Sequence, residues 1–470
     1  MKTTNLPSSI QTARSGTAGL LRAACALRWL LLLLLTLPAV GQAQFNYTTA
    51  NGTVTITGYT GPGGEVSIPA TINGLPVTSI GREAFSRNYD LTSVTIPSSV
   101  TSIGDGAFIY CSSLTSVTIP NSVTSIGAAP FYFCTSLRSV TIPSSVTSIG
   151  VRAFYACTSL ASVTIGNGLT NISYGAFYSC TNLASVTIPN SVTSIGEDVF
   201  YDCSSLTNVA IPDSVTSIGG SAFRYCVRLT SITIPDSVTS LGFSAFSGCA
   251  SLTSVAIPGS LTNISLGAFS RCTNLTSITI PSSVTRIDSF AFAYCTSLTS
   301  ITIPSSVTSI KNIAFQGCTS LTSVTIPSSV TSIGNYVFSG CTSLKGVYYQ
   351  GNAPTFDGGD AFSASDAWTV YRLPGTTGWG PTFGGRPTAL WVLENPLILN
   401  NGPSFGVRTN QFGFIISWAT NLSVVVEACT DLAQANWSPV GTNTLTDGSS
   451  YFSDPQWTNH PTRFYRLRSP

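Results

Sequence analysis

Charged residues are scarce in this chain of 470 residues. Lysine and arginine together number 20 and aspartate and glutamate 18, so 8% of the residues are charged and the net charge is +2. An average soluble protein carries about 25% charged residues. Binding to nucleic acid needs clustered cations, so this near-neutral balance argues against a nucleic-acid partner.

Histidine is almost absent as well. His460 is the single histidine, which excludes His-rich metal sites and leaves little room for histidine-based acid–base chemistry. It lies between Asn459 and Pro461 and is interpreted as an exposed loop residue. The one acidic cluster, around Glu197 and Asp198, is interpreted as a solvated face, with weak cation binding as the alternative. No Gly-rich phosphate loop opens a helix. The sequence therefore predicts no enzyme, no cofactor and no metal site.

A hydrophobic run of membrane-spanning length is also missing. Trp29 to Val40 is a 12-residue apolar stretch, which suits the core of a secretory signal peptide and is short for a span. Four basic residues precede it, and Gly41 to Ala43 supplies small residues for cleavage. We predict a signal peptide at residues 1–43 and an exported mature chain, 44–470, without a transmembrane span. An uncleaved N-terminal anchor is the alternative.

A unit of 23 residues is repeated along most of the chain. Phenylalanine recurs at positions 85, 108, 131, 154, 177, 200, 223, 246, 269, 292, 315 and 338. Cysteine recurs at the same step from 111 to 341, and leucine from 91 to 344. One unit, Leu91 to Ser113, reads L-T-S-V-T-I-P-S-S-V-T-S-I-G-D-G-A-F-I-Y-C-S-S. Internal repeats of this period indicate a solenoid.

The unit has the pattern of a strand followed by turns. Val94 and Ile96 obey the period of two of a β-strand, and Pro97 ends it because proline cannot donate to a ladder. Ala107 and Phe108 are predicted to form a short helical turn. One unit cannot bury its own apolar side, but stacked units can. The predicted fold is a β-rich solenoid of twelve 23-residue coils, with a parallel sheet of one strand per coil and short helical turns.

The motif L-x-x-V-x-I-P-x-S-V-x-x-I-G-x-x-A-F-x-x-C resembles the BspA-type, or treponemal-type, leucine-rich repeat over about residues 66–344. The resemblance implies a curved solenoid on exported or surface proteins of bacteria, often linked to adhesion to host or matrix proteins and to other cells. The repeat itself does not specify a ligand.

The ends differ from the array. Residues 44–90 are predicted to form an N-terminal cap and first coil, 91–344 the repeats, and 345–390 a C-terminal cap that keeps Val347 to Tyr349 as a strand and Ala361-Phe362 as a turn. Residues 391–470 have short strands separated by turn residues, which predicts a small antiparallel β-sandwich-like module. This module is interpreted as a surface-sorting element, a passive spacer or a second binding module.

The mature chain has twelve cysteines, eleven of them at one position of the repeat. In register they form a column with neighbours ~5 Å apart, a distance that alone does not exclude disulfides. Side chains that point the same way do not face each other, and cysteine packs as a small hydrophobe. Buried free thiols are therefore predicted, with some disulfides as the alternative.

The strand positions between the apolar residues predict a flat, uncharged, hydroxyl-rich face. This candidate interaction face comprises Ser93, Thr95, Ser116, Thr118, Ser139, Thr141, Ser162, Thr164, Ser185, Thr187, Ser231, Thr233, Ser277, Thr279, Ser300, Thr302, Ser323 and Thr325. Asn208, Ala210 and Ala256 are exceptions to the pattern. Irregular charges that could contact a ligand are Arg138, Arg224, Arg228, Arg271 and Arg286. Simple solvation is the alternative for both sets.

These features predict a non-enzymatic protein that is secreted or lies at the cell surface. Its predicted ligands are extracellular or cell-surface proteins or glycans. The alternative is a structural surface scaffold without a dedicated ligand.

Overall fold

The structure is a computed structural model that describes residues 44–356, 362, 368–391, 397–399, 405–408, 411–417, 423–434, 436–445, 449–460 and 462–468. The predicted signal peptide, residues 1–43, lies outside the described residues, as does Ala361 of the predicted cap turn. Within the described part, no helix has the length and apolar character that crossing a membrane would require.

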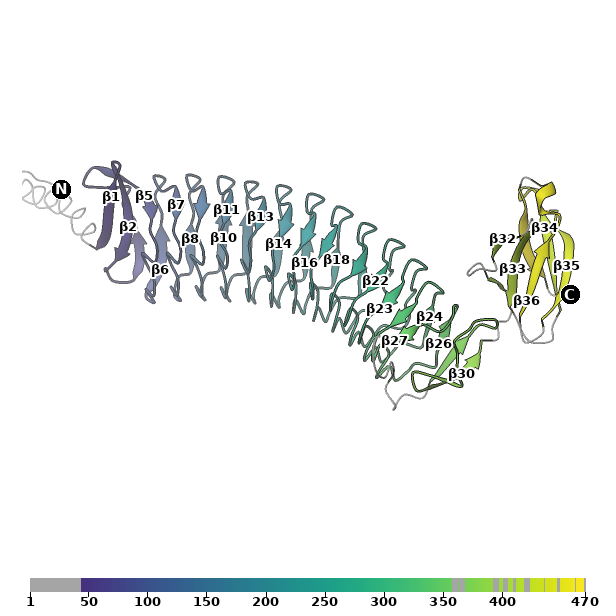
Figure 1. Cartoon of the computed structure of the whole chain (residues 1–470). Coiled ribbons are helices and arrows are strands. Elements are labelled where there is room, and N and C mark those ends of the chain that lie inside the picture. The colour runs from purple at the N-terminus through teal and green to yellow at the C-terminus, as the bar shows by residue number, and fades with distance from the viewer. Residues whose placement is uncertain are drawn as a thin grey trace, which may run out of the picture.

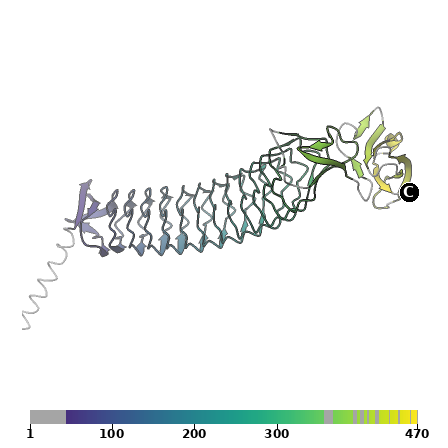
Figure 2. The ribbon, with the colours of Figure 1, turned by 90° about the horizontal axis from the view of Figure 1, so that it is seen from below.

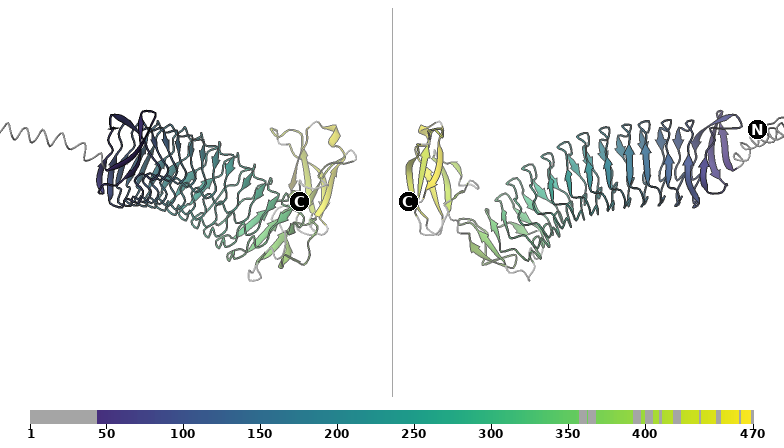
Figure 3. Two further views of the ribbon diagram at one scale, coloured as in Figure 1. Left: turned by 60° about the vertical axis from the view of Figure 1, so that its left-hand side comes forward. Right: turned by 180° about the vertical axis from the view of Figure 1, so that it is seen from behind.

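The repeats form an elongated, curved solenoid in which each coil lies beside the next (Figure 1). The N-terminal coils lie nearly in line and the array bends toward its C-terminal end, which is also visible from other directions (Figure 2, Figure 3). Neighbouring coils pair in parallel with a shift of one repeat, so that Val140 lies opposite Val163 and Ile149 opposite Ile126. The predicted β-solenoid of leucine-rich repeats is confirmed.

The first ladder of strands contains the S-V-T segment of the regular coils and the equivalent segments of the other coils and caps. Its members are β3 (Gly64–Ser67), β6 (Leu91–Thr95), β8 (Ser116–Thr118), β10 (Ser139–Ile142), β12 (Ser162–Ile165), β14 (Ser185–Thr187), β16 (Asn208–Ala210), β18 (Ser231–Thr233), β20 (Ser254–Ala256), β24 (Ser323–Ile326), β26 (Gly346–Tyr349), β28 (Thr369–Arg372) and β30 (Arg386–Leu390). Isolated bridges link Ala256, Thr279, Thr302 and Thr325 between β20 and β24.

A second ladder corrects the prediction of one strand per coil. Strands at the S-I segment, which have two residues in each regular coil, also pair in parallel, because Val100 and Ile103 both turn inward and leave the backbone between them extended. The members are β5 (Leu75–Ile80), β7 (Ser102–Ile103), β9 (Ser125–Ile126), β11 (Ser148–Ile149), β13 (Asn171–Ile172), β15 (Ser194–Ile195), β17 (Ser217–Ile218), β19 (Ser240–Leu241), β21 (Asn263–Ile264), β22 (Arg286–Ile287), β23 (Ser309–Ile310), β25 (Ser332–Ile333) and β27 (Thr355–Phe356).

The third side of each coil is a run of turns, which corrects the expectation of short helices. Gly106 and Tyr110 have positive φ angles of 58° and 62°. The N–H groups of Gly106, Phe108 and Tyr110 each donate to a carbonyl of the next coil at 2.8 Å. A helix would direct these N–H groups along its own axis, whereas the alternating backbone directs them toward the neighbouring coil.

The core is a set of ladders of identical side chains. The phenylalanines from Phe85 to Phe338 are buried and stack with ring centroids 4.9 to 5.8 Å apart. Leucine, valine, isoleucine and cysteine form the other buried columns. The repeat positions predicted to be apolar and inward are therefore in the core, where near-parallel stacking adds to the energy of burial.

Both ends of the solenoid are closed by aromatic residues. At the N-terminal end, β1 (Phe45–Ala50) and β2 (Thr53–Tyr59) form a hairpin, β4 (Thr71–Ile72) pairs with β5, and the Tyr59 ring stacks on Phe85 at 5.3 Å. At the other end Phe362 continues the phenylalanine stack at 6.4 Å from Phe338, and Trp368 packs beside both. The hairpin partner of β30 here is β29 (Thr382–Phe383). These rings keep the terminal apolar ladders from water.

The C-terminal residues form two antiparallel sheets around a separate core (Figure 1). One sheet contains β31 (Leu397–Leu399), β32 (Gly406–Arg408), β33 (Gln411–Ser417) and β36 (Ser449–Asp454); the other contains β34 (Ser423–Cys429), β35 (Ser438–Thr444) and β37 (Phe464–Arg468). The single helical segment among the described residues is the 3₁₀ turn η2 (Trp457–Asn459). Buried Glu427 is paired with Arg466 and Arg468 across this second sheet.

Candidate functional site

The structure places the predicted hydroxyl face on the first ladder. All eighteen serines and threonines point outward, and all are exposed except Ser93, which is half-buried. Parallel pairing aligns them in two rows, one of serines and one of threonines, as Ser139 opposite Ser162 and Thr141 opposite Thr164 show. We call these two rows the polar face. Its formation follows from the period of two of a strand whose alternate residues are Val and Ile.

Hydroxyl groups elsewhere in the coil are used to join coils. In the coil of residues 275–297, Ser283 Oγ donates to the Leu261 carbonyl at 2.7 Å and Thr285 Oγ1 to the Thr262 carbonyl at 3.2 Å. Thr276 and Thr296 donate to the preceding coil in the same way.

The polar face differs from these positions. The hydroxyls of Ser277 and Thr279 in the same coil make no hydrogen bond to another described residue. The S-V-T hydroxyls therefore remain available to solvent or to a ligand, while four chemically similar groups of the same coil bind the preceding coil.

One coil of the polar face lacks both hydroxyls. Asn208 and Ala210 replace the usual Ser and Thr, and the first ladder breaks between β16 and β18. A hollow of about 230 Å³ lies there, lined also by Ile211, Ser231 and Thr233. The sequence showed the two substitutions, but the break in the ladder that opens the hollow depends on packing.

Aromatic residues continue the polar face at its C-terminal end. Thr325 lies opposite Tyr348, and Tyr348 opposite Tyr371, so two tyrosines follow in the threonine row. Their rings stack with centroids 4.8 Å apart, and Trp391 packs on Tyr348 at 5.0 Å. All three side chains are half-buried. The sequence analysis identified Tyr348 as a strand residue but did not connect these three residues.

The five candidate arginines do not form a group. Arg138 and Arg228 are exposed, and Arg138 flanks β10 beside the polar face. Arg224 and Arg271 lie on the turn side, where their guanidinium groups stand over Tyr225 at 5.0 Å and Tyr294 at 5.6 Å. The last, Arg286, lies on the second ladder and pairs with Asp288 at 2.6 Å. No single surface contains all five arginines, and their contact with a ligand stays a prediction.

A row of tyrosines on the turn side escaped the sequence analysis. Tyr132, Tyr155, Tyr178 and Tyr201 stack in consecutive coils with centroids 4.4 to 4.8 Å apart. Burial and the neighbouring tyrosines raise the pKa of Tyr178. The sequence feature that could have predicted this row is a tyrosine directly after the repeat phenylalanine in four successive units. Because the ring faces cover each other, this row presents mainly ring edges and hydroxyls.

The column cysteines are buried free thiols in the structure. Each Sγ lies within hydrogen-bond distance of the phenylalanine carbonyl of the preceding coil, as Cys134 does with Phe108 at 3.2 Å. Burial raises the pKa of Cys111 to about 12. Within the described residues no group of three His, Cys, Asp or Glu side chains is placed to hold a metal ion.

Groups that catalysis could use are dispersed. His460 directly follows η2 and is half-buried rather than exposed as predicted. Asp198 lies far from it in the sequence, on the turn side, where burial and then the charge of Glu197 raise the pKa of its carboxyl group. The structure assigns neither residue a partner typical of a nucleophilic triad.

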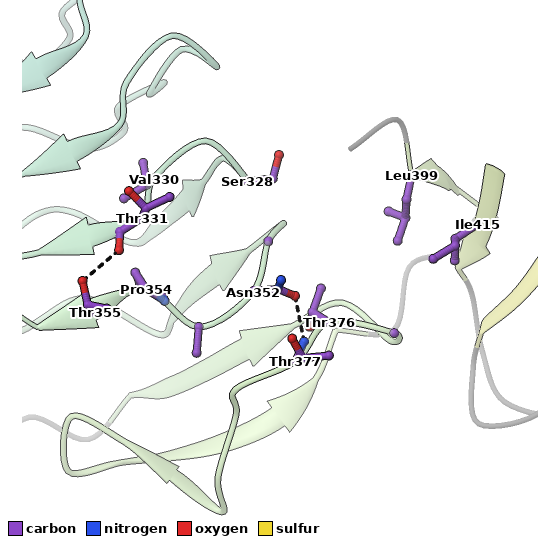
Figure 4. Close-up of a pocket in the computed structure, with 13 residues that line it drawn as sticks. Ser328, Val330, Thr331, Asn352, Pro354, Thr355, Thr376, Thr377, Leu399 and Ile415 are labelled. Atoms are coloured by element: carbon purple, nitrogen blue, oxygen red, sulfur yellow. Dashed lines mark hydrogen bonds between the residues drawn. The ribbon is translucent and has the colours of Figure 1, made fainter. Parts of the chain in front are cut away.

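A larger cavity of about 620 Å³ lies where the last coils meet the C-terminal module. Figure 4 shows Leu399 and Ile415 of the module facing loops that carry Ser328, Asn352 and Thr376. Asn352 Oδ1 accepts a bond from the Thr377 N–H at 2.8 Å, and Thr355 Oγ1 donates to the Thr331 carbonyl at 3.1 Å. The described residues that line it include no titratable side chain, so they offer contact surface but no acid–base group.

Comparison with known proteins gives consistent matches to one kind of repeat. The family described as BspA type leucine rich repeat region matches in six copies, over residues 78–207, 193–321 and 263–375. A leucine-rich repeat protein from Bacteroides ovatus is 32% identical, with 70% of this chain and 92% of that chain covered and a TM-score of 0.56.

Two further solved structures are similar in sequence. A leucine rich cell surface protein from Faecalibacterium prausnitzii is 31% identical, with 66% of this chain and 94% of that chain covered and a TM-score of 0.40. The T. pallidum leucine rich repeat protein is 30% identical, with 45% and 88% covered and a TM-score of 0.35. No curated protein matches the chain.

Proposed function

Because this chain belongs to the BspA-type leucine-rich repeat family, we propose that it is an exported, non-enzymatic protein that binds other proteins or glycans at the cell surface or outside the cell. The observation that carries the proposal is the polar face, whose exposed hydroxyls make no hydrogen bond to another described residue, while other hydroxyls of the coil, such as those of Thr276 and Ser283, bind the preceding coil. A broad, uncharged surface with free donors and acceptors suits an extended partner.

Export and surface location belong to the same proposal. The basic segment and the apolar stretch Trp29 to Val40 support a cleaved signal peptide at residues 1–43. We also propose the domain boundaries: an N-terminal cap and first coil at 44–90, the repeats at 91–344, a C-terminal cap at 345–390 and the C-terminal module at 391–470. The separate core of the C-terminal module supports the last boundary. For this module we propose a role in attachment to the surface.

The test is binding of labelled mature protein, residues 44–470, to immobilised matrix proteins, a glycan array and intact cells. A face variant with Thr187→Glu and Thr233→Glu places charge on the polar face. Its matched control has Ser148→Glu and Ser240→Glu, two exposed serines on the second ladder. We expect saturable binding that the face variant loses and the control keeps. Equal binding by both variants would remove the polar face from the proposal.

Residues 44–390 tested in parallel separate the solenoid from the module. Binding kept by 44–390 assigns the ligand site to the solenoid, and binding lost with residues 391–470 transfers it to the module. The alternative function is a structural scaffold without a dedicated ligand. Absence of binding to every target by a correctly folded chain would favour that alternative.

A further inference from the structure

We propose that Tyr348, Tyr371 and Trp391 form a stacking platform on which the polar face binds a neutral polysaccharide. This inference rests on the proposed function and assigns that surface a ligand class and an anchor point. The platform is continuous with the polar face, because strand pairing places Tyr348 and Tyr371 directly after Thr325 in the threonine row.

The platform depends on a glycine in the neighbouring row. Gly346 lies opposite Ser323, at the end of the serine row. A Cβ atom at Gly346 would lie 2.6 Å from Cε2 of Tyr371, so the tyrosine ring lies over this backbone position. Packing of an aromatic ring over a strand glycine fixes the ring against the sheet. The Tyr371 side chain is therefore held in place before any ligand arrives.

The arrangement leaves ring surface for a ligand. Tyr348 covers one side of the Tyr371 ring at 4.8 Å. On the other side, the next residue in the row is Ala389, whose methyl group is small. The turn-side tyrosine row differs, since Tyr155 and Tyr178 each have stacked neighbours on both sides. Of the two aromatic groups, the platform is thus the one with an incompletely covered ring.

The chemistry of the surface favours a neutral sugar chain. A pyranose ring has an apolar C–H face, which is attracted to the negative face of an aromatic ring. Its hydroxyls can exchange hydrogen bonds with the free serine and threonine hydroxyls that extend along the array. Neither row contains a charged residue from β6 to β26. Two cations lie next to the platform in the sequence: Lys345 flanks β26, and Arg372, which is half-buried, directly follows Tyr371. Without clustered cations, the surface has nothing to pair with the charges of an acidic polymer.

The length of the surface suits a polymer better than a short oligosaccharide. The polar face is repeated in coils from β6 to β24, and neighbouring strands lie ~4.8 Å apart. Many weak hydrogen bonds along one chain would add to the contact with the rings. The platform would therefore determine where the polysaccharide is held, and the hydroxyl rows would determine how far along the solenoid it is bound.

The experiment measures retardation of the mature chain, residues 44–470, in native gels that contain a neutral β-glucan or galactomannan, with alginate as the acidic comparison. The platform variants are Tyr371→Ala and Trp391→Ala. Tyr336→Ala is the matched control, because Tyr336 lies on the turn side and is 44% exposed. Tyr371→Phe keeps the ring over Gly346. Circular dichroism and the thermal midpoint check that each variant is folded.

We expect at least one neutral polysaccharide to retard the wild-type chain, with the apparent affinity reduced at least tenfold in the two platform variants. Tyr336→Ala and Tyr371→Phe should bind within twofold of wild type. Wild-type affinity in both platform variants, or stronger retardation by alginate, would overturn the platform. If the face variant described above loses ligand binding while the platform variants keep it, the platform is wrong and the proposed function stands.

Discussion

Each column cysteine is held between a hydrophobic environment and one polar contact. Cys203 Sγ lies 3.2 Å from the Phe177 carbonyl of the preceding coil, and its side chain is fully buried. The thiol can act as a weak donor to that carbonyl, which an apolar side chain without an S–H group could not. This accounts for cysteine, rather than valine or alanine, at a position that every coil from Cys111 to Cys341 shares.

The first prediction concerns thiol reactivity. The mature chain has twelve cysteines, and all are buried free thiols in the structure. At pH 8 we expect a thiol-specific reagent to label almost none of the cysteines of the folded chain. In the chain unfolded in denaturant under argon, we expect about twelve cysteines to be labelled. Mass-spectrometric counting of labels measures both. A count near zero after unfolding without reductant would instead show disulfides.

The second prediction follows from the direction of the thiol pKa shifts. Burial raises the pKa of Cys111, Cys249 and Cys295 to about 12, above the ordinary value of 9.0. Above pH 9 the unfolded chain releases protons that the folded chain retains, so the stability is fully present below pH 9 and falls as the pH rises. Each such thiol costs about 1.4 kcal/mol per pH unit in this range.

Urea unfolding in the presence of reductant, between pH 7 and pH 10.5, measures this fall. A variant with Cys203→Ala, Cys226→Ala and Cys249→Ala has three fewer buried thiols and should show a shallower dependence on pH. The same slope in the variant and the wild type would attribute the fall to other groups.

At the level of the strand, the coil separates hydroxyls that bind protein from hydroxyls that do not. Ser283 is half-buried and donates to the preceding coil, whereas Ser277 is exposed on the polar face and makes no bond to another described residue. Both belong to the same coil and to the same residue type. The pair therefore isolates the contribution of the hydrogen bond between coils.

The third prediction is that Ser283→Ala destabilises the chain by about 1 kcal/mol, the net value of a typical hydrogen bond, and Ser277→Ala by less than about 0.5 kcal/mol. Chemical unfolding monitored by circular dichroism measures both variants. Equal effects would mean that the inter-coil bond contributes no net stability and that the two hydroxyls are equivalent.

Two of the three sides of each coil were not predictable as elements. The S-I strand has two residues, too short for the period of two to be visible in the sequence. The turn side needs positive φ angles, which sequence analysis associates with glycine, yet Tyr110, Arg152 and Asp198 adopt them. Stacking on the next coil imposes these angles, because it pairs the N–H groups that the turn directs outward.

At the scale of the whole molecule, the solenoid behaves as a linear array of nearly equal units. Its core consists of columns that repeat every 23 residues, and each coil contacts mainly its neighbours. Stability in such arrays is approximately a sum of unit terms and interface terms. Removal of one complete unit therefore preserves every remaining interface type.

The fourth prediction compares two deletions. Removing residues 298–320 takes out one complete unit and should leave a folded solenoid with a slightly lower thermal midpoint. Removing residues 298–319 leaves one extra residue, which shifts the register and turns apolar side chains outward, so a much larger loss is expected. Circular dichroism and thermal unfolding distinguish the two. Similar midpoints for both deletions would show that a one-residue loop absorbs the shift.

The sequence by itself determined the repeat unit, the apolar columns, the outward Ser and Thr rows and the family. It did so because side-chain periodicity alone decides which residues face inward when identical units stack. The tertiary structure decided which hydroxyls are free: Thr279 and Thr285 are chemically identical, and only the position of the preceding coil leaves one unpaired and bonds the other. It also brought together Tyr348, Tyr371 and Trp391, because their contact depends on parallel pairing of β26, β28 and β30 outside the strict repeat.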